Sequence, residues 1–193
     1  MRRRTRGLFG GTFDPPHAGH VAAVRAALAA LDLDEMVVTV AADPWLKGAR
    51  PAAPGWARLE MATAAFGLID GVVVSDVELR RGGPTYTIDT VEALLAEAPE
   101  DRVVLVVGAD AAATLGSWHR ASELAALVDV AVVPRPGATA GVPEEFSVRT
   151  LQMPRVDLSS TDVRAALGRG EDPSGLLPAA VVRVVLAHRL YSP

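Results

Sequence analysis

Two histidines close to the N-terminus are the side chains of this sequence best suited to chemistry. His17 and His20 are three residues apart and end the run Gly-Gly-Thr-Phe-Asp-Pro-Pro-His-Ala-Gly-His. At the start of a helix, residues with this spacing share one face. The N–H groups there have no intrahelical partner and the helix dipole is positive, which favours a bound phosphate. Imidazoles add donors that can be neutral or charged near physiological pH. The segment therefore predicts an anion site.

Plainer interpretations of the same segment stay open. Two glycines after a strand often form an ordinary turn, and a histidine on a helix is often structural or solvated. No Gly-Lys-Ser/Thr follows the two glycines, so the segment is not a Walker loop, and it lacks the Rossmann glycine fingerprint. A zinc pair would need a third ligand, and none is apparent.

The run from Leu158 to Arg164, Leu-Ser-Ser-Thr-Asp-Val-Arg, is a second candidate phosphate site. Ser159 with Asp162 three residues later fits a capping box, with Asp in place of the usual Glu. The simple interpretation is a well-capped helix. The functional one is a cradle of hydroxyls and unpaired amides, to which Arg164 adds a guanidinium one turn later.

Together the two segments resemble the nucleotidyltransferase superfamily with the His-x-Gly-His motif, which is related to class I tRNA synthetases. The N-terminal run is most similar to that of the bacterial nicotinate-nucleotide adenylyltransferase family, and the second run resembles its Ile-Ser-Ser-Thr-x-x-Arg motif, with Leu158 in place of Ile. The resemblance implies that His17, His20 and Arg164 are catalytic and stabilise charge while the α-phosphate of ATP is attacked. It also implies that ATP is bound by these three residues together with Gly10, Gly11, Thr12, Phe13, Gly108, Asp110, Ser159, Ser160 and Thr161.

The middle of the chain carries the segments that would select the second substrate. Residues 82–90, Gly-Gly-Pro-Thr-Tyr-Thr-Ile-Asp-Thr, resemble the family segment that holds the nicotinate carboxylate, with Thr85 as a hydroxyl donor. Gly108-Ala109-Asp110 resembles the family Gly-x-Asp that contacts ribose, and Trp118 resembles the tryptophan that stacks on the pyridine ring. Alternatively, these residues are a turn with a Thr cap, a helix-capping Asp and a Trp packed between helices.

Lys47 is the only lysine of the chain, and all other basic side chains are arginines. It lies in a loop rich in Pro and Gly, where it is either a phosphate ligand or a solvated surface lysine. Arg135 matches an Arg-Pro-Gly turn of the family. The residues expected to bind nicotinate mononucleotide are therefore Thr12, Lys47, Thr85, Tyr86, Trp118 and Arg135.

The reaction that the resemblance implies is adenylyl transfer from ATP to nicotinate mononucleotide, giving deamido-NAD and pyrophosphate. No carboxylate cluster for a metal is evident, which indicates that Mg²⁺ arrives with ATP. Three alternatives stay open: an enzyme that prefers the nicotinamide mononucleotide, a non-catalytic nucleotide sensor, and a nucleic-acid-binding module.

The elements that must position these residues alternate along the chain. Short apolar runs predict strands that end at residues 8–9, before Gly10-Gly11, and that cover 36–40, 72–74, 103–107, 128–133 and 147–151. Helical patterns cover 21–31, 56–66, 87–95, a segment from 159, and 178–188, with Thr87 as an N-cap. This alternation predicts an α/β, Rossmann-like, open and mostly parallel sheet with helices on both faces, which is also the nucleotidyltransferase fold. Ligands of such sheets bind at the carboxyl ends of the strands.

Length and composition fit one globular domain. The chain has 193 residues and 50% hydrophobic residues, and the absence of cysteine excludes disulfides and thiolate chemistry. We expect a single domain over residues 1–193, with 159–193 as a C-terminal helical segment that completes the ATP site. The net charge of -4 argues against nucleic acid as a partner. With no signal peptide and no apolar run long enough to span a bilayer, we expect a cytoplasmic protein that does not bind membranes. Its expected partners are small-molecule substrates, and it could also form homo-oligomers.

Overall fold

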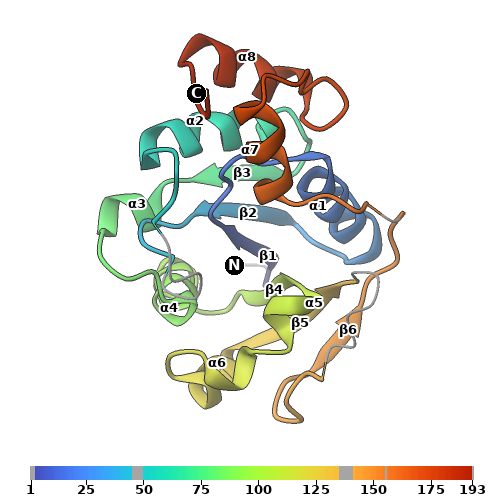
Figure 1. Ribbon diagram of the computed structural model, residues 1–193. Helices are drawn as coiled ribbons and strands as arrows, with labels where there is room; N and C mark the ends of the chain where they lie inside the picture. The colour runs from blue at the N-terminus through green and yellow to red at the C-terminus, as the bar shows by residue number, and fades with distance from the viewer. Residues whose placement is uncertain (1–2, 45–49, 135–140, 155, 193) are drawn as a thin grey trace.

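The molecule is built on a parallel sheet. The computed structural model describes residues 3–44, 50–134, 141–154 and 156–192. Within them, the strands form one six-stranded sheet in the order β3-β2-β1-β4-β5-β6, in which every neighbouring pair is parallel (Figure 1). The strands are β1 (Thr5–Gly11), β2 (Glu35–Val40), β3 (Val72–Ser75), β4 (Arg102–Gly108), β5 (Val128–Val133) and β6 (Val148–Thr150). The predicted α/β fold with an open parallel sheet is confirmed.

Helices connect these strands and cover both faces of the sheet. They are α1 (Ala18–Ala30), α2 (Gly55–Phe66), α3 (Val77–Arg81), α4 (Thr87–Glu97), α5 (Ala109–Ala112), α6 (Ala121–Leu127), α7 (Ser160–Gly168) and α8 (Ala179–Ala187), with a 3₁₀ turn at Leu115–Ser117. The helix patterns from the sequence are confirmed, and α3, α5 and α6 are added to them.

The central strands divide their side chains between two apolar cores. In β1, Leu8 packs into the core under α4 and α6, whereas Phe9 packs into the core under α1 and α2. The side chains of β4 alternate in the same way, with Leu105 on one face and Val104 on the other. A strand buried on both faces needs apolar residues at consecutive positions, which explains the unbroken apolar run of β4.

A third apolar cluster joins the C-terminal segment to the sheet domain. Val163 of α7 and Val181 and Val185 of α8 pack with Met61 of α2. In Figure 1, α7 and α8 (orange to red) lie beside α2 at one end of the molecule. This packing holds the start of α7 over the sheet.

Two local predictions were wrong. Thr87 is not the N-cap of α4 but its first residue. The N-cap of this helix is Tyr86, whose side chain makes no capping hydrogen bond. The first strand does not stop before the two glycines, since β1 continues through Gly10 and Gly11 to pair with Thr39 and Val40.

The strand order creates a crevice between β1 and β4. Strands β2 and β3 lie on one side of β1, and β4, β5 and β6 lie on the other. The chain connections that follow β1 and β4 therefore lead to opposite sides of the sheet. Ligands of open α/β sheets bind at such a reversal of the strand order. The carboxyl ends of the two strands are Gly11 and Gly108.

Candidate active site

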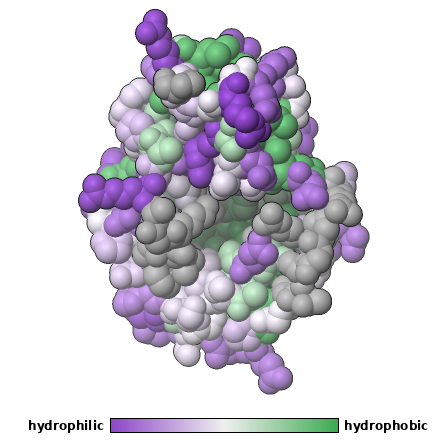
Figure 2. All heavy atoms as spheres, in the orientation of Figure 1, coloured by the Kyte–Doolittle hydropathy of each residue, from purple (hydrophilic) through white to green (hydrophobic). Residues whose placement is uncertain are grey.

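A cleft of about 740 Å³ opens at the carboxyl ends of β1 and β4. Figure 2 shows it as a hollow with an apolar floor in the centre of the face. This volume is in the range of small-molecule sites. Most of the residues that the sequence singled out line it: Gly10, Gly11, Thr12, His17, His20, Thr85, Gly108, Asp110, Trp118, Ser159, Ser160, Thr161 and Arg164.

His17 and His20 form the N-terminal cap of α1. His17 is the N-cap residue, and its Nδ1 accepts the N–H of Gly19 at 3.2 Å. His20 is the third helical residue, and its Nδ1 accepts the N–H of His17 at 3.1 Å. These reciprocal bonds make a capping box in which two imidazoles replace the usual hydroxyl and carboxylate. The ring centroids are 3.8 Å apart, so both rings reach the same part of the cleft.

The cap determines the tautomer of each neutral ring. Nδ1 of both histidines is an acceptor from the backbone, so the proton of the neutral imidazole is on Nε2. Each ring therefore presents an N–H donor at its far side. Phe13 supports this arrangement, because its buried ring contacts that of His20 edge-on with centroids 5.3 Å apart.

The start of α7 forms the opposite wall. Ser159 is the N-cap, and its hydroxyl accepts the N–H of Asp162 at 3.2 Å. The Asp162 carboxylate in turn accepts the Ser159 hydroxyl at 2.5 Å. Ser159 is therefore the N-cap as predicted, and the carboxylate bonds to its hydroxyl where a capping box would have it accept the backbone N–H of Ser159. Ser160 donates to the carbonyl of Pro15 at 2.9 Å. This bond directly joins the two segments predicted to bind phosphate, residues 10–20 and 158–164, which we call the phosphate motifs.

Arg164 makes the second link between the motifs. Its NH1 donates to the carbonyl of Asp14 at 2.7 Å, and its NH2 donates to the hydroxyl of Thr161 at 3.3 Å. The side chain keeps about 32% of its surface exposed where it lines the cleft. The guanidinium is thus oriented by the chain and still reaches solvent.

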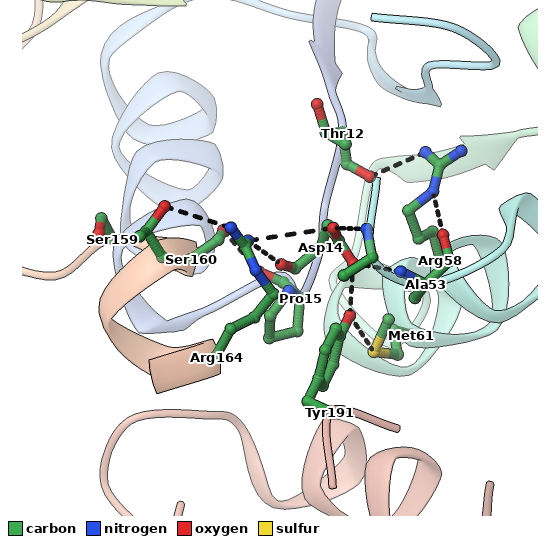
Figure 3. A network of polar contacts seen from close by, with 12 residues as sticks. Thr12, Asp14, Pro15, Ala53, Arg58, Met61, Ser159, Ser160, Arg164 and Tyr191 are labelled. Carbon is green, nitrogen blue, oxygen red and sulfur yellow. Dashed lines mark hydrogen bonds and ion pairs between the residues drawn. The ribbon is translucent and has the colours of Figure 1, made fainter. Parts of the chain in front are cut away.

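Asp14 is the centre of the polar network drawn in Figure 3. Its carboxylate is buried and accepts the N–H groups of Ala52 (2.7 Å) and Ala53 (3.0 Å) and the hydroxyl of Tyr191 (2.7 Å). Arg164 NH1 lies 3.9 Å from the same carboxylate. Asp14 therefore ties the first phosphate motif to the start of α2, to α7 and to the end of the chain.

A buried arginine completes this network from α2. Arg58 donates to the carbonyls of Thr12 (3.0 Å) and Ala41 (2.6 Å), at the ends of β1 and β2. Burial lowers the pKa of the Arg58 guanidinium, and the charge of Asp14 opposes that effect. Its position, 2% exposed, indicates that it fixes the strand ends and does not meet substrate.

The other half of the cleft holds the residues expected to meet the nucleotide acceptor. The Thr85 hydroxyl accepts the N–H groups of Ala42 (3.0 Å) and Asp43 (3.2 Å), which fastens the end of β2 to the segment before α4. The Trp118 indole donates to the Thr114 hydroxyl at 3.1 Å, and its half-buried ring packs on the core and lines the cleft. Asp110 also lines the cleft, as the second residue of α5.

A buried carboxyl group lies in the wall of this half. Glu78 of α3 is 4% exposed and accepts the Thr90 hydroxyl at 2.8 Å, and Arg81 NH2 lies 3.1 Å from the same hydroxyl. Burial raises the pKa of Glu78, against the opposing effects of the Thr90 hydrogen bond and the Arg81 charge.

Two residues expected at the site, Phe13 and Tyr86, do not line the described cleft. The Phe13 side chain is buried in the core at 2% exposure. It supports His20, and its ring is not accessible to a ligand. The Tyr86 ring stacks on His119 with centroids 4.1 Å apart. Lys47 and Arg135 lie outside the residues that the structure describes.

Sequence reasoning missed the roles of Asp14, Arg58 and Tyr191. Asp14 belongs to the N-terminal run, but its burial follows from partners 38 and 177 residues away. Arg58 and Tyr191 stand in segments with no motif of their own. An Asp inside an otherwise apolar and Pro-rich stretch was the one available signal.

The described residues show neither a metal cluster nor a membrane-spanning helix. They contain no group of three or more His, Cys, Asp or Glu side chains that could hold a metal ion. No helix among them is long and apolar enough to cross a membrane.

Comparison with known proteins identifies relatives along nearly the whole chain. A family model described as cytidylyltransferase-like matches residues 8–166. A protein of Bordetella petrii, named "Probable nicotinate-nucleotide adenylyltransferase", is 41% identical over 96% of this chain and 97% of its own length. A protein of Leifsonia xyli with the same name is 39% identical over 96% of this chain and 92% of its own length.

Solved structures agree with the fold. A Plasmodium falciparum nicotinic acid mononucleotide adenylyltransferase complexed with NaAD superposes with a TM-score of 0.81 and 17% identity, covering 98% of both chains. The same enzyme complexed with APC gives a TM-score of 0.79 and 16% identity over 98% of each chain. At this identity the likeness concerns the arrangement of the elements.

Proposed function

The chain belongs to the nicotinate-nucleotide adenylyltransferases of the cytidylyltransferase-like family, and from that membership we propose how its cleft works. The reaction is the transfer of an adenylyl group from ATP to nicotinate mononucleotide, a step of NAD biosynthesis. The observation that carries the proposal is the meeting of the two phosphate motifs, through the bonds from Ser160 to Pro15 and from Arg164 to Asp14.

The nucleophile needs no general base. A phosphate monoester has a second pKa near 6, so the 5′-phosphate of the mononucleotide is largely a dianion near pH 7. One of its oxygens bonds to the α-phosphorus of ATP. The bond from that phosphorus to the oxygen that bridges the α- and β-phosphates breaks, and pyrophosphate leaves. The protein's part is positioning and charge stabilisation.

We assign the charge stabilisation to His17, His20 and Arg164. The capping box uses Nδ1 of both imidazoles, so each neutral ring carries its proton on Nε2, and both residues line the cleft at the positive end of α1. Arg164 approaches from α7 and brings a permanent charge to the same phosphates. The rest of the ATP site would be the backbone groups and side-chain oxygens of Gly10, Gly11, Thr12, Phe13, Gly108, Asp110, Ser159, Ser160 and Thr161. Phe13 would offer only its backbone, since its side chain is buried in the core.

We place the nicotinate mononucleotide in the other half of the cleft. Trp118 offers an aromatic face, and the segment around Thr85 and Tyr86 offers donors to the carboxylate. Thr85 is already fastened to the end of β2, so its O–H can donate while its lone pairs accept from the backbone. Lys47 and Arg135 are proposed as further ligands of the acceptor phosphate, from outside the described residues.

The divalent cation belongs to the substrate in this proposal. Members of this enzyme class use a divalent metal with ATP, and we propose Mg²⁺. The described residues offer no metal cluster, so the cation would arrive as Mg²⁺–ATP. We further propose one domain over residues 1–193, with residues 159–193 completing the ATP site, in a cytoplasmic enzyme that acts on small molecules and does not bind nucleic acid.

The test is the identity of the products. Purified protein with Mg²⁺–ATP and nicotinate mononucleotide should form pyrophosphate and deamido-NAD in equal amounts, separated by chromatography. ATP binding without either product would instead support the nucleotide-sensor alternative. Equal use of CTP would place the chain with the cytidylyl-transferring members of the superfamily.

A further inference from the structure

The end of the chain returns to the active site in an unusual backbone conformation. Arg189 and Tyr191 have φ angles of 50° and 64°. Residues other than glycine rarely adopt this left-handed region. Leu190 and Tyr191 pack against the third apolar cluster, and the Tyr191 hydroxyl donates to Asp14 at 2.7 Å, across 177 residues of sequence.

We propose that Tyr191 is a positioning residue for the adenylyl transfer, which acts through Asp14 to hold Arg164 at the phosphates. The inference rests on the role assigned to Arg164 above. It adds a requirement for the last residues of the chain, which do not line the cleft themselves and reach its lining through Asp14.

The bonds around Asp14 explain how a distant hydroxyl would control the arginine. The buried Oδ1 accepts from Ala53 and Tyr191, and Oδ2 accepts from Ala52. Arg164 NH1 is 3.9 Å from Oδ2 but donates to the main-chain carbonyl of Asp14 at 2.7 Å. The hydrogen bonds to the carboxylate thus come from two backbone N–H groups and the Tyr191 hydroxyl, and none comes from the arginine.

Removal of the Tyr191 hydroxyl would change that balance. A buried carboxylate that loses a hydrogen-bond donor is destabilised, and a nearby cation that moves closer restores part of the lost stability. Arg164 is the nearest one of the network, so its guanidinium would turn toward the carboxylate and away from the cleft. Burial and the neighbouring Asp14 raise the pKa of Tyr191, so its hydroxyl keeps the proton that it donates throughout the working pH range.

The test is a double-mutant cycle between Tyr191→Phe and Arg164→Ala. Tyr191→Phe should lower kcat roughly 10-fold, the scale expected for a misplaced catalytic group, while KM for nicotinate mononucleotide stays unchanged. In the Arg164→Ala background, the same change should alter kcat by less than about twofold, because its target is gone. Thermal melting of each variant shows whether the fold persists.

A control variant addresses general loosening of the C-terminus. His188→Ala removes the 2.9 Å contact from the end of α8 to Glu60 of α2, in the same region but outside the Asp14 network. It should keep the wild-type kcat. If Tyr191→Phe does not fold, Asp14→Asn tests the network from the other side, since it keeps the main-chain carbonyl that holds Arg164 and removes the charge that would draw the guanidinium away. Any change in kcat should then be equal in the wild-type and Arg164→Ala backgrounds, and a loss confined to the wild-type background would contradict the inference.

The outcomes separate this inference from the proposed function. If Arg164→Ala alone leaves kcat unchanged, the role assigned to Arg164 fails. If Arg164→Ala is impaired but Tyr191→Phe is fully active, or loses the same factor in both backgrounds, the positioning role of Tyr191 is wrong.

Discussion

At the scale of single residues, the two histidines have a structural task and a proposed chemical one. Nδ1 of each ring caps α1, and the opposite nitrogen carries the proton of the neutral ring. An imidazole can do both because its two nitrogens point in different directions. A hydroxyl or carboxylate in the same cap would satisfy the helix and bring no such donor to a phosphate.

Substitutions of His20 separate these tasks. His20→Ala should lower kcat by roughly 10²–10³, the effect of losing one donor to developing charge. It should also reduce stability by about 1 kcal/mol through loss of the cap. His20→Gln should recover the stability, because Gln is a usual partner in a capping box, but not kcat. Steady-state kinetics and chemical unfolding of both variants check this, and full activity of either would remove His20 from the mechanism.

The buried Glu78 predicts a pH dependence of stability. Its folded pKa is raised above the ordinary value of 4.5, so the folded protein holds this proton more tightly than the unfolded chain. Its contribution is therefore most favourable below pH 4.5 and is lost as the pH rises toward the raised pKa. The stability of the wild type relative to Glu78→Gln should fall by at most about 1.4 kcal/mol per pH unit over that window. Urea unfolding at several pH values measures it, and a difference that does not vary with pH would contradict it.

At the scale of elements, the turn from β1 into α1 carries the first phosphate motif. Gly11 ends the strand, and a Cβ there would come within 2.7 Å of the Phe13 ring. Phe13 itself has a φ of 50° and its ring contacts His20. The glycine is therefore needed for close packing under the histidine, in addition to any approach of the ligand.

Gly11→Ala tests the packing of this turn. The added methyl should displace Phe13 and lower the free energy of unfolding by about 1–3 kcal/mol, the usual cost of overpacking. It should lower kcat as well, since His20 rests on that ring. Gly168→Ala, at an exposed helix end where a Cβ meets nothing within 4 Å, is the matched control and should be neutral or stabilising. Equal stability of the two variants would refute the packing argument.

The regular elements were predictable because their patterns are local. The unbroken apolar run of β4 and the Ser159 cap of α7 are visible in a few consecutive residues. Helix α3 has only five residues, too few for a periodic pattern. Thr87 failed as a cap because the preceding Tyr86 already has the extended backbone of the N-cap position.

The Asp14 network was not predictable, since its bonds join residues that no local pattern relates. Arg58 donates to a carbonyl 46 residues away, and Arg164 donates to one 150 residues away. The motifs therefore indicated which side chains to propose as phosphate ligands, whereas the groups that hold those side chains came only from the tertiary structure.

At the scale of the whole molecule, an acidic protein handles two polyanionic substrates. The net charge of -4 gives no general attraction to phosphates. We therefore propose that local groups capture the phosphates: the starts of α1 and α7, the two histidines and Arg164, all on the cleft. Global charge thus argues against nucleic acid as a partner and does not exclude small anions.

The rate of pyrophosphate release with matched substrates tests the central claim most directly. Mg²⁺–ATP is supplied with either nicotinate or nicotinamide mononucleotide, and kcat/KM is measured for each. A site whose donors meet the carboxylate leaves them unpaired with the amide, so the acid should be preferred on the order of 10²-fold or more. Pyrophosphate release that is equally fast with the amide would contradict the assigned substrate, and release with neither mononucleotide would contradict the account as a whole.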